Sequence, residues 1–319
     1  MRRLYDVCIK VDMPLVNAKE MLAKATANGY AIGCFNIDSI AMAQAVLEAA
    51  DELNSPVMLS LSKGSRAFMH PGNIKDMVNV ISANMKIPFA LHLDHGHSID
   101  LCKECIDEGF TSVMFDGSGL DFDTNVALTK DLCTYAHAKG ATVEAELGPL
   151  DAHATRSEET RYTNPEQAIR FIKETGVDCL AVSVGTGHGL QKFLANEVPH
   201  IRYDILKKIK AELPSFPLVL HGASHIDPDL LAKFNQYGGQ IKEAGGIPEQ
   251  LLIQAMHINV SKINIATDFR MTYITALREA LANHPSNFEP RIFLAPAKEA
   301  VKQLVKYKLM HVFNSVNRI

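Results

Sequence analysis

Short apolar runs alternate with longer amphipathic segments along most of the chain, and each kind predicts a different element. The runs carry the β-branched and aromatic residues typical of buried strands, whereas the segments between them repeat apolar positions every three or four residues, as helices do. Eight strands are predicted in this way, over residues 31–36, 56–62, 87–94, 111–116, 141–147, 179–184, 217–221 and 261–266.

Eight strand–helix units predict a (β/α)8 barrel of the TIM type. Strands that are apolar throughout are typical of parallel sheets covered by helices, and eight such units close into a barrel. The helical segments have the Pro starts and Gly stops that helices prefer, as in P-E-Q-A-I-R-F-I-K-E-T-G at 165–176. Because no break in composition divides the chain, we expect a single domain over 1–319, with long loops after strands five and seven at 148–164 and 234–248.

Charge and the N-terminal sequence exclude several classes of protein. The 319 residues include 36 acidic and 32 basic ones, for a net charge of -4, and neither sign forms a block. Nucleic acid and an anionic membrane are therefore not expected as partners. Asp6, Lys10 and Asp12 stand where a signal peptide needs an apolar run, and no uncharged run approaches the roughly 20 residues of a membrane span. A cytoplasmic location is expected.

The six cysteines are scattered, unlike the disulfide framework of a small secreted domain. Cys102 and Cys105 have C-x-x-C spacing, but no second pair accompanies them. We interpret them as two small residues one turn apart in a helix.

Polar and titratable residues stand where the predicted strands end. The stretch A-L-H-L-D-H-G-H-S at 90–98 is the densest example. Because the C-terminal strand ends of a barrel converge on one site, these residues are candidates for it. They are Asn36, Ser62, Asp94, His95, Asp116, Glu146, His188 in the loop after strand six, His221 and Asn264.

Three of these candidates, His95, His188 and His221, predict a metal site. Neutral imidazoles with an open coordination position are what a catalytic Zn²⁺ needs, and Asp94 adds a carboxylate beside the first histidine. The sequence separations are too long for a zinc finger, so the prediction depends on the barrel. A single isolated histidine would be interpreted as structural.

Two glycine-bearing loops predict a phosphate near this metal. G-T-G-H-G-L at 185–190 and H-G-A-S at 221–224 place glycine N–H groups beside a histidine, and Ser224 and Thr267 add hydroxyls. Either loop alone is weak evidence, because glycine after a strand is more often only a turn.

Five motifs, taken in order, resemble those of the class II, zinc-dependent ketose-bisphosphate aldolases. They are L-H-x-D-H, E-A-E-L-G, G-T-x-H-G-L, L-V-L-H-G-A-S and K-I-N-x-x-T-D. The resemblance runs from I-G-C-F-N near residue 32 to the closing F-N-S-V-N-R-I. It implies a TIM-barrel lyase that cleaves the C3–C4 bond of a ketose bisphosphate, with the metal acting as a Lewis acid.

The resemblance also implies a role for each matching position. His95, His188 and His221 match the zinc ligands, and Glu146 matches a carboxylate near an alternative metal position. Asp94 matches the acid/base residue that exchanges the proton of the C4 hydroxyl, and Asn264 the residue that steadies the enediolate. The remaining implied substrate contacts are Gly189, Gly222, Ser224 and Thr267 at the C1 phosphate, and Ser62 and Asn36 elsewhere. A monovalent cation, Na⁺ or K⁺, is implied near this phosphate.

Three other titratable residues need separate interpretation. Lys262 is the nearest candidate for the Schiff base of a lysine-dependent aldolase, but it begins the eighth strand and is expected to point to the opposite end of the barrel. His92 shares a strand face with Asp94 and is expected to line the barrel, whereas His97 follows the turn and is expected to be exposed.

The chain departs from the family pattern after E-A-E-L-G. The pattern continues there with a Gly-Gly hinge and an acidic pair, whereas this chain has P-L-D-A-H-A-T-R-S-E-E. Asp151, His153, Glu158 or Glu159 could replace the missing glutamate, and the sequence does not choose among them.

The substrate branch is also left open. Ala266 resembles the tagatose-bisphosphate branch, since fructose-bisphosphate enzymes typically carry Asp there, whereas T-D-F-R through Arg270 and the insertion at 237–250 resemble the fructose branch. Arg270 could pair with the distal phosphate through two charge-assisted hydrogen bonds.

Three hypotheses follow. The leading one is reversible cleavage of fructose 1,6-bisphosphate to dihydroxyacetone phosphate and glyceraldehyde 3-phosphate. The second is the same mechanism on tagatose 1,6-bisphosphate or another ketose 1-phosphate, and the third is a zinc-binding paralogue with little catalysis. The resemblance implies a homodimer or homotetramer.

Overall fold

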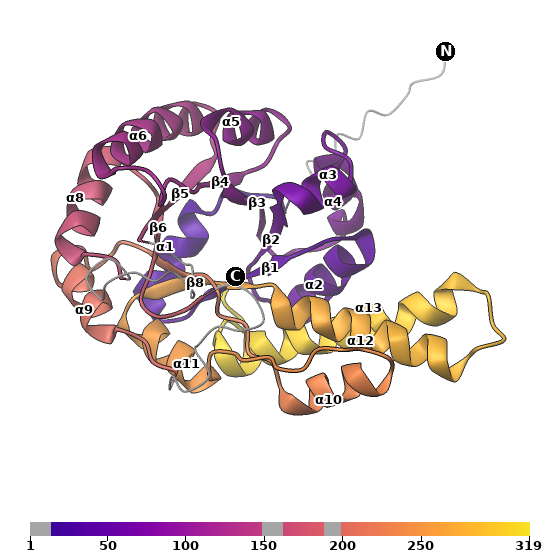
Figure 1. The fold of residues 1–319 in the computed structure, drawn as a ribbon. Helices are drawn as coiled ribbons and strands as arrows, with labels where there is room; N and C mark the ends of the chain where they lie inside the picture. The colour runs from indigo at the N-terminus through magenta and orange to yellow at the C-terminus, as the bar shows by residue number, and fades with distance from the viewer. Residues whose placement is uncertain (1–13, 149–161, 188–198) are drawn as a thin grey trace, which may run out of the picture.

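The computed structural model describes residues 14–148, 162–187 and 199–319, in which parallel strands close into a barrel (Figure 1). Each strand pairs with the next along the chain, and the last pairs with the first. The strands are β1 Ile32–Asn36, β2 Val57–Ser62, β3 Phe89–Gly96, β4 Ser112–Phe115, β5 Thr142–Leu147, β6 Cys179–Val182, β7 Leu218–Leu220 and β8 Val260–Ile265. The predicted (β/α)8 barrel is confirmed, and every predicted strand overlaps an observed one.

Helices surround the barrel, as Figure 1 shows. They are α1 Lys19–Asn28, α2 Ile40–Glu52, α3 Lys63–Phe68, α4 Ile74–Ser82, α5 Ile99–Asp107, α6 Phe122–Ala138, α8 Pro165–Thr175, α9 Tyr203–Glu212, α10 Pro228–Gln236, α11 Glu249–Ile258, α12 Thr267–Asn283 and α13 Pro290–Tyr307, followed by a π-helical segment η1, Lys308–Val312. Their ends follow the sequence signals. In α8 the Asn164 side chain accepts from the Gln167 N–H, and Gly176 ends the helix in the left-handed conformation.

The barrel interior changes from apolar to polar along the strands. Near the strand starts it is filled by small and apolar side chains, and helix α1 closes this end with Met21, Leu22 and Ala25. One or two positions further along the same inward faces come Asp94, Glu146 and other polar side chains. The interior therefore has an apolar plug at one end and a polar site at the other.

The connections differ in part from the predicted ones. Phe234, predicted to begin a long loop, lies inside α10, and the irregular segment instead runs from 237 to 248 between α10 and α11. Most of the predicted loop after β5 lies outside the described residues. The connection from 183 to 202 between β6 and α9, which carries G-T-G-H-G-L, is also long, although long loops were predicted only after strands five and seven.

Helices α12 and α13 form an antiparallel pair whose far end projects from the barrel (Figure 1). The near part of α13 packs on α2, where Lys298 pairs with Glu48 at 2.5 Å and Lys302 with Glu52 at 2.5 Å. At the connection between the two helices, Phe288 is 93% exposed.

No helix among the described residues is long and apolar enough to cross a membrane. Five cysteines in the described part of the chain are buried free thiols. Cys102 and Cys105 lie on the buried face of α5, which fits their interpretation as helix packing residues.

Candidate functional site

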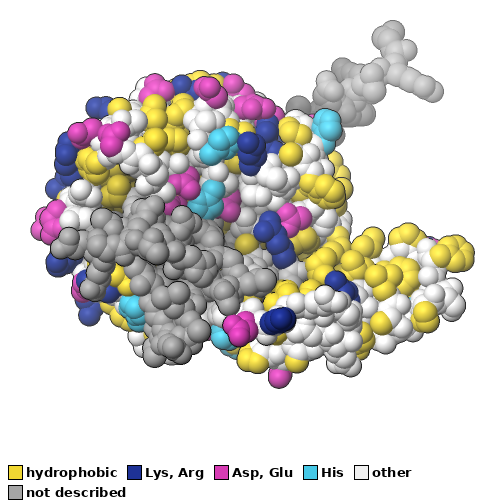
Figure 2. Space-filling model, viewed as in Figure 1, with side chains coloured by type: hydrophobic (Ala, Val, Ile, Leu, Met, Phe, Trp, Pro, Cys, Tyr) yellow, Lys and Arg dark blue, Asp and Glu magenta, His cyan; other side chains and the backbone are white. Residues whose placement is uncertain are grey.

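The polar strand ends meet at the C-terminal mouth of the barrel. Ligating atoms of Asp94, His95 and His221 lie within 4.8 Å of one another, and so do those of His95, Asp116 and Glu146. In Figure 2, histidine and acidic side chains lie together near the barrel mouth. His188 and Gly189 lie outside the described residues.

His95 is placed by an irregularity at the end of β3. The pairing of β3 with β4 shifts register between Leu93 and Gly96, and His95 has a left-handed φ of 49°. A non-glycine residue in this region is rare and is often found at functional sites. A Cβ on Gly96 would come within 2.6 Å of both Cys102 Sγ and the Met114 carbonyl oxygen, so the turn needs glycine there.

A carboxylate fixes the ring of His95. Its Nδ1 lies 2.9 Å from Asp116 Oδ2, so Nε2 faces the site, 3.9 Å from Asp94 Oδ1. Burial works against protonation, but the hydrogen bond to Asp116 and the charges of Asp94 and Glu146 outweigh it and raise the pKa of His95 to about 9. Although burial acts against it, the same hydrogen bond lowers the pKa of Asp116 to about 2.

His221 is oriented in the same way by a carboxylate from within the barrel. Its Nε2 lies 2.7 Å from Glu144 Oε1, and both side chains are fully buried. Nδ1 therefore faces the mouth, 3.7 Å from Asp94 Oδ1. The rings of His95 and His221 stand edge to face with centroids 4.7 Å apart, which leaves one nitrogen of each directed at a common point.

Two amides hold the Asp94 carboxylate. Asn36 Nδ2 donates to Oδ2 at 2.7 Å, and Asn264 Nδ2 donates to Oδ1 at 3.1 Å. Burial alone would raise the pKa of Asp94, but the two nearby histidines and the Asn36 hydrogen bond lower it. Asp94 is therefore an ionised carboxylate that can accept a proton.

Glu146 is the carboxylate whose environment best fits a cation. It is 1% exposed, and burial together with the charge of Asp116 raises the pKa of Glu146 well above its usual value. Its Oε2 lies 3.7 Å from His95 Nδ1 and has no hydrogen-bond partner among the described residues. A buried carboxylate oxygen without a donor, beside two carboxylate-oriented histidines, is a donor set that suits a divalent metal.

The predicted phosphate residues that the structure describes gather where β7 and β8 end. Ser224 Oγ accepts from the backbone N–H groups of Ala266 and Thr267 at 3.2 and 3.1 Å. Thr267 opens α12, and Gly222 has a φ of 61°. TIM barrels frequently bind phosphate between these two loops and a helix N-terminus.

Ser62 and Arg270 lie together on another part of the rim. Arg270 pairs with Asp38, Nε to Oδ2 at 2.6 Å and Nη2 to Oδ1 at 3.1 Å. Ser65 joins the group, because its hydroxyl donates to Asp38 at 2.6 Å and lies 2.8 Å from Ser62 Oγ. Sequence reasoning missed Asp38 and Ser65, although Asp38 lies just beyond β1 and Ser65 lies in the first turn of α3, which follows β2 directly.

The predicted direction of the Lys262 side chain is wrong. The residue lies inside the barrel in the middle of β8, with Nζ 2.7 Å from Asn264 Oδ1 and 2.8 Å from Glu144 Oε2. β8 begins at Val260, and the long side chain of Lys262 extends toward the mouth along the face that it shares with Asn264. Sequence reasoning missed Glu144 as well, although the alternation E-x-E in β5 places it on the face of Glu146.

The two remaining histidines lie as predicted. His92 is fully buried inside the barrel, with Nδ1 2.8 Å from Ser112 Oγ. His97 is exposed, and its Nε2 lies 3.4 Å from Lys63 Nζ.

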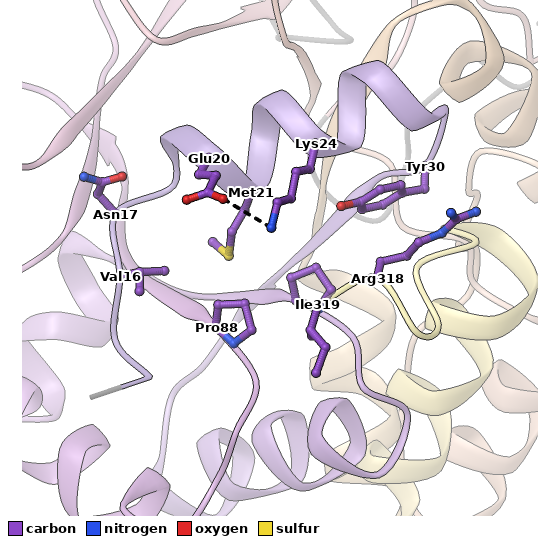
Figure 3. A pocket seen from close by; sticks show the side chains of 10 residues that line it. Val16, Asn17, Glu20, Met21, Lys24, Tyr30, Pro88, Arg318 and Ile319 are labelled. Atoms are coloured by element: carbon purple, nitrogen blue, oxygen red, sulfur yellow. Dashed lines mark ion pairs between the residues drawn. The ribbon is translucent and has the colours of Figure 1, made fainter. Parts of the chain in front are cut away.

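A cavity of about 450 Å³ lies at the other end of the barrel (Figure 3). Glu20 and Lys24 of α1 form an ion pair of 3.2 Å on one side of it. Its lining residues precede the strands or belong to α1 and the chain end, and are Val16, Asn17, Glu20, Met21, Lys24, Tyr30, Pro56, Pro88, Arg318 and Ile319. It contains none of the candidate site residues.

Comparisons with known proteins agree with this arrangement. A family model described as fructose-bisphosphate aldolase class-II matches residues 16–318. The chain is 39% identical to a fructose-bisphosphate aldolase of Treponema pallidum over 95% of this chain and 97% of that protein. It is 44% identical to a fructose-bisphosphate aldolase of Thermus caldophilus over 95% of this chain and 99% of that protein. Among solved structures it is similar to the YdjI aldolase of Escherichia coli, with a TM-score of 0.76, 28% identity, and coverage of 95% of this chain and 99% of that one.

Proposed function

The chain belongs to the class II fructose-bisphosphate aldolase family, and on that premise we propose that it cleaves fructose 1,6-bisphosphate reversibly to dihydroxyacetone phosphate and glyceraldehyde 3-phosphate. The observation that carries this proposal is the group of Asp94, His95 and His221, whose ligating atoms lie within 4.8 Å of one another. A base therefore stands beside the imidazoles of the candidate metal centre.

We propose zinc as the metal, held by His95 and His221 together with His188, with Glu146 available at an alternative position. His95 Nε2 and His221 Nδ1 are the nitrogens that would hold the metal, because Asp116 and Glu144 engage the other two. When bound, such an ion supplies a Lewis acid that stabilises negative charge developing on the substrate carbonyl oxygen.

The side chains around the candidate metal centre perform the proton transfer and the positioning. In cleavage, Asp94 takes the proton of the C4 hydroxyl as the C3–C4 bond breaks, and the bonding electrons remain on the dihydroxyacetone phosphate half, whose C3 is then protonated. Asn264 donates toward the developing charge, and Ser224, Thr267 and Gly222 hold the C1 phosphate with Gly189. Candidates for the proton donor to C3 are Asp151, His153, Glu158 and Glu159, which lie outside the described residues.

Two further contacts are proposed for substrate and ions. Ser62 and Arg270 stand together on the rim, where a distal phosphate could share the Arg270 guanidinium with Asp38. A monovalent cation near the C1 phosphate is carried over from the family resemblance.

Tagatose 1,6-bisphosphate is the second candidate substrate, and Ala266 favours it. Its backbone N–H donates to Ser224 Oγ, one of the proposed phosphate contacts, and the fructose branch typically carries Asp at this position. The two sugars are epimers at C4, so one lining side chain can change preference by about 1–3 kcal/mol.

Dihydroxyacetone phosphate release from the two epimers decides between these substrates. We expect the purified protein to cleave fructose 1,6-bisphosphate faster, and Ala266→Asp to leave this order unchanged. Faster cleavage of the tagatose epimer, reversed by Ala266→Asp, would assign the chain to the tagatose branch. Release from neither, with zinc bound, would leave another ketose 1-phosphate as the substrate, or the weakly catalytic zinc-binding paralogue.

Residues 1–319 are proposed to form one domain in the cytoplasm. The family match from 16 to 318 supports a single domain, and the five buried free thiols of the described residues suit a reducing compartment. We also propose that the chain forms a homo-oligomer, a homodimer or homotetramer, through the projecting ends of α12 and α13. Exposed apolar side chains gather there, namely Leu281, Phe288, Ile292 and Leu294.

A further inference from the structure

A buried lysine lies directly beneath the proposed acid/base group. Lys262 is fully buried, and its ammonium faces three partners: Asn264 Oδ1 at 2.7 Å, Glu144 Oε2 at 2.8 Å and His92 Nε2 at 3.5 Å. An ammonium has three N–H donors and no acceptor, so these partners account for all of its hydrogen-bonding capacity. Its charge and direction are therefore fixed by the barrel interior.

The lysine determines which way the Asn264 amide faces. Because Nζ only donates, Oδ1 is the end of the amide directed at Lys262. Nδ2 is then directed upward, 3.1 Å from Asp94 Oδ1 and 3.3 Å from His221 Nδ1. A flipped amide would set its NH₂ against the ammonium and its oxygen against the Asp94 carboxylate, so both contacts would be repulsive.

The same ammonium is the counter-ion of Glu144, which orients His221. Glu144 is fully buried and accepts from His221 Nε2 at 2.7 Å through its other oxygen. Removing the lysine alone would leave a buried carboxylate without its counter-ion, which is strongly destabilising. Any test must therefore remove both charges of the Lys262–Glu144 pair.

We propose that Lys262 is a positioning residue of the aldolase reaction, which holds the Asn264 amide with its Nδ2 directed at Asp94 and the substrate. This inference rests on the proposed function above. Lys262 acts through Asn264 and forms no bond to the substrate. Burial alone would lower the pKa of Lys262, but Glu144 and the nearby thiols raise it, so the amine stays protonated and unsuited to a Schiff base.

If Lys262 acts through Asn264, removing Lys262 should have little effect on kcat when Asn264 is absent. Four proteins test this: the wild type, Asn264→Ala, Lys262→Met with Glu144→Gln, and the three substitutions combined. Glu144→Gln keeps an oxygen facing His221 Nε2, so no protein of the set buries an unpaired charge at this place. Lys298→Met with Glu48→Gln removes the same types of side chain between α13 and α2, and is expected to leave kcat unchanged.

We expect the charge-pair variant to lower kcat about 10- to 50-fold while KM changes less than about threefold, with zinc content by elemental analysis unchanged. In the Asn264→Ala background the same pair of changes should lower kcat less than about threefold. Equal losses in both backgrounds, or a loss that follows zinc content, would overturn the role assigned to Lys262.

Failure of the proposed function can be distinguished from failure of this inference. If the wild type releases no dihydroxyacetone phosphate from either ketose bisphosphate, the proposed function fails. The same four proteins are then compared by calorimetric binding of dihydroxyacetone phosphate. A smaller loss of affinity on removing the pair when Asn264 is absent supports the positioning role, and an undiminished loss contradicts it.

Discussion

Asp94 carries the proton transfer in this account, because it is ionised, held by two amides and directed at the imidazoles. Asp94→Asn preserves its shape and removes its basicity. We expect kcat for cleavage to fall by about 10²- to 10⁴-fold, with zinc content and thermal stability retained. Assays of dihydroxyacetone phosphate release check this, and a variant with more than a tenth of wild-type kcat would show that another group is the base.

Asn36→Ala tests how much the position of the Asp94 carboxylate matters, separately from its role in proton transfer. It removes one of the two amide donors to Asp94 but leaves the base itself in place. Its effect on kcat should therefore be clearly smaller than that of Asp94→Asn.

The His95–Asp116 pair predicts a pH dependence of stability in the metal-free protein. The pKa of His95 is raised to about 9 in the folded state. Its contribution to the free energy of unfolding is therefore complete below its unfolded-state pKa near 6.5, and it is lost as pH rises toward 9. The pKa of Asp116 is lowered to about 2, so its contribution is present above about 4 and is lost as pH falls toward 2.

The contribution of the His95–Asp116 pair should therefore raise the melting temperature of the chelated protein most between about pH 4 and 6.5. Asp116→Asn should flatten the decline between pH 6.5 and 9. An unchanged slope in that variant would show that the pair does not stabilise the folded state.

At the scale of elements, the irregular end of β3 places His95 as no regular strand would. Gly96→Ala would put a methyl group against Cys102 Sγ and the Met114 carbonyl. We expect a loss of about 1–3 kcal/mol in the free energy of unfolding, measured by urea denaturation of the metal-free protein, and weaker zinc binding. Gly119→Ala is the matched control, because nothing lies within 4 Å of its added Cβ. Equal stability of the two variants would refute the packing argument.

The strands were predictable from the sequence to a greater extent than the irregular segments and the long side chains. Strands and their inward faces were predictable because apolar runs and two-residue alternation are local signals, and the same logic located Asp94 and Glu146. The register break at His95 was not predictable from the sequence, because it depends on contacts with α5 and β4. Lys262 was misplaced because its long side chain reaches a neighbouring layer of the barrel, which a strand position alone does not reveal.

For the whole molecule, the projecting ends of α12 and α13 are predicted to contact a second copy of the chain. Phe288→Asp places a charge on a side chain that is 93% exposed, and should shift the protein toward monomer in light-scattering measurements after gel filtration. Val80→Asp on α4, at a residue 76% exposed, should leave the mass unchanged. The assembly would lie elsewhere if Phe288→Asp kept the full mass.

Asp94, His95 and His221 are proposed to form the centre of a metal-dependent aldolase. Metal dependence is measured as dihydroxyacetone phosphate release from fructose 1,6-bisphosphate before chelation, after chelation and after Zn²⁺ is restored. We expect activity to be lost with the metal and to return with stoichiometric zinc in the wild type, while His221→Ala neither binds zinc at that stoichiometry nor recovers. Cleavage that persists in fully chelated, metal-free protein would contradict this expectation.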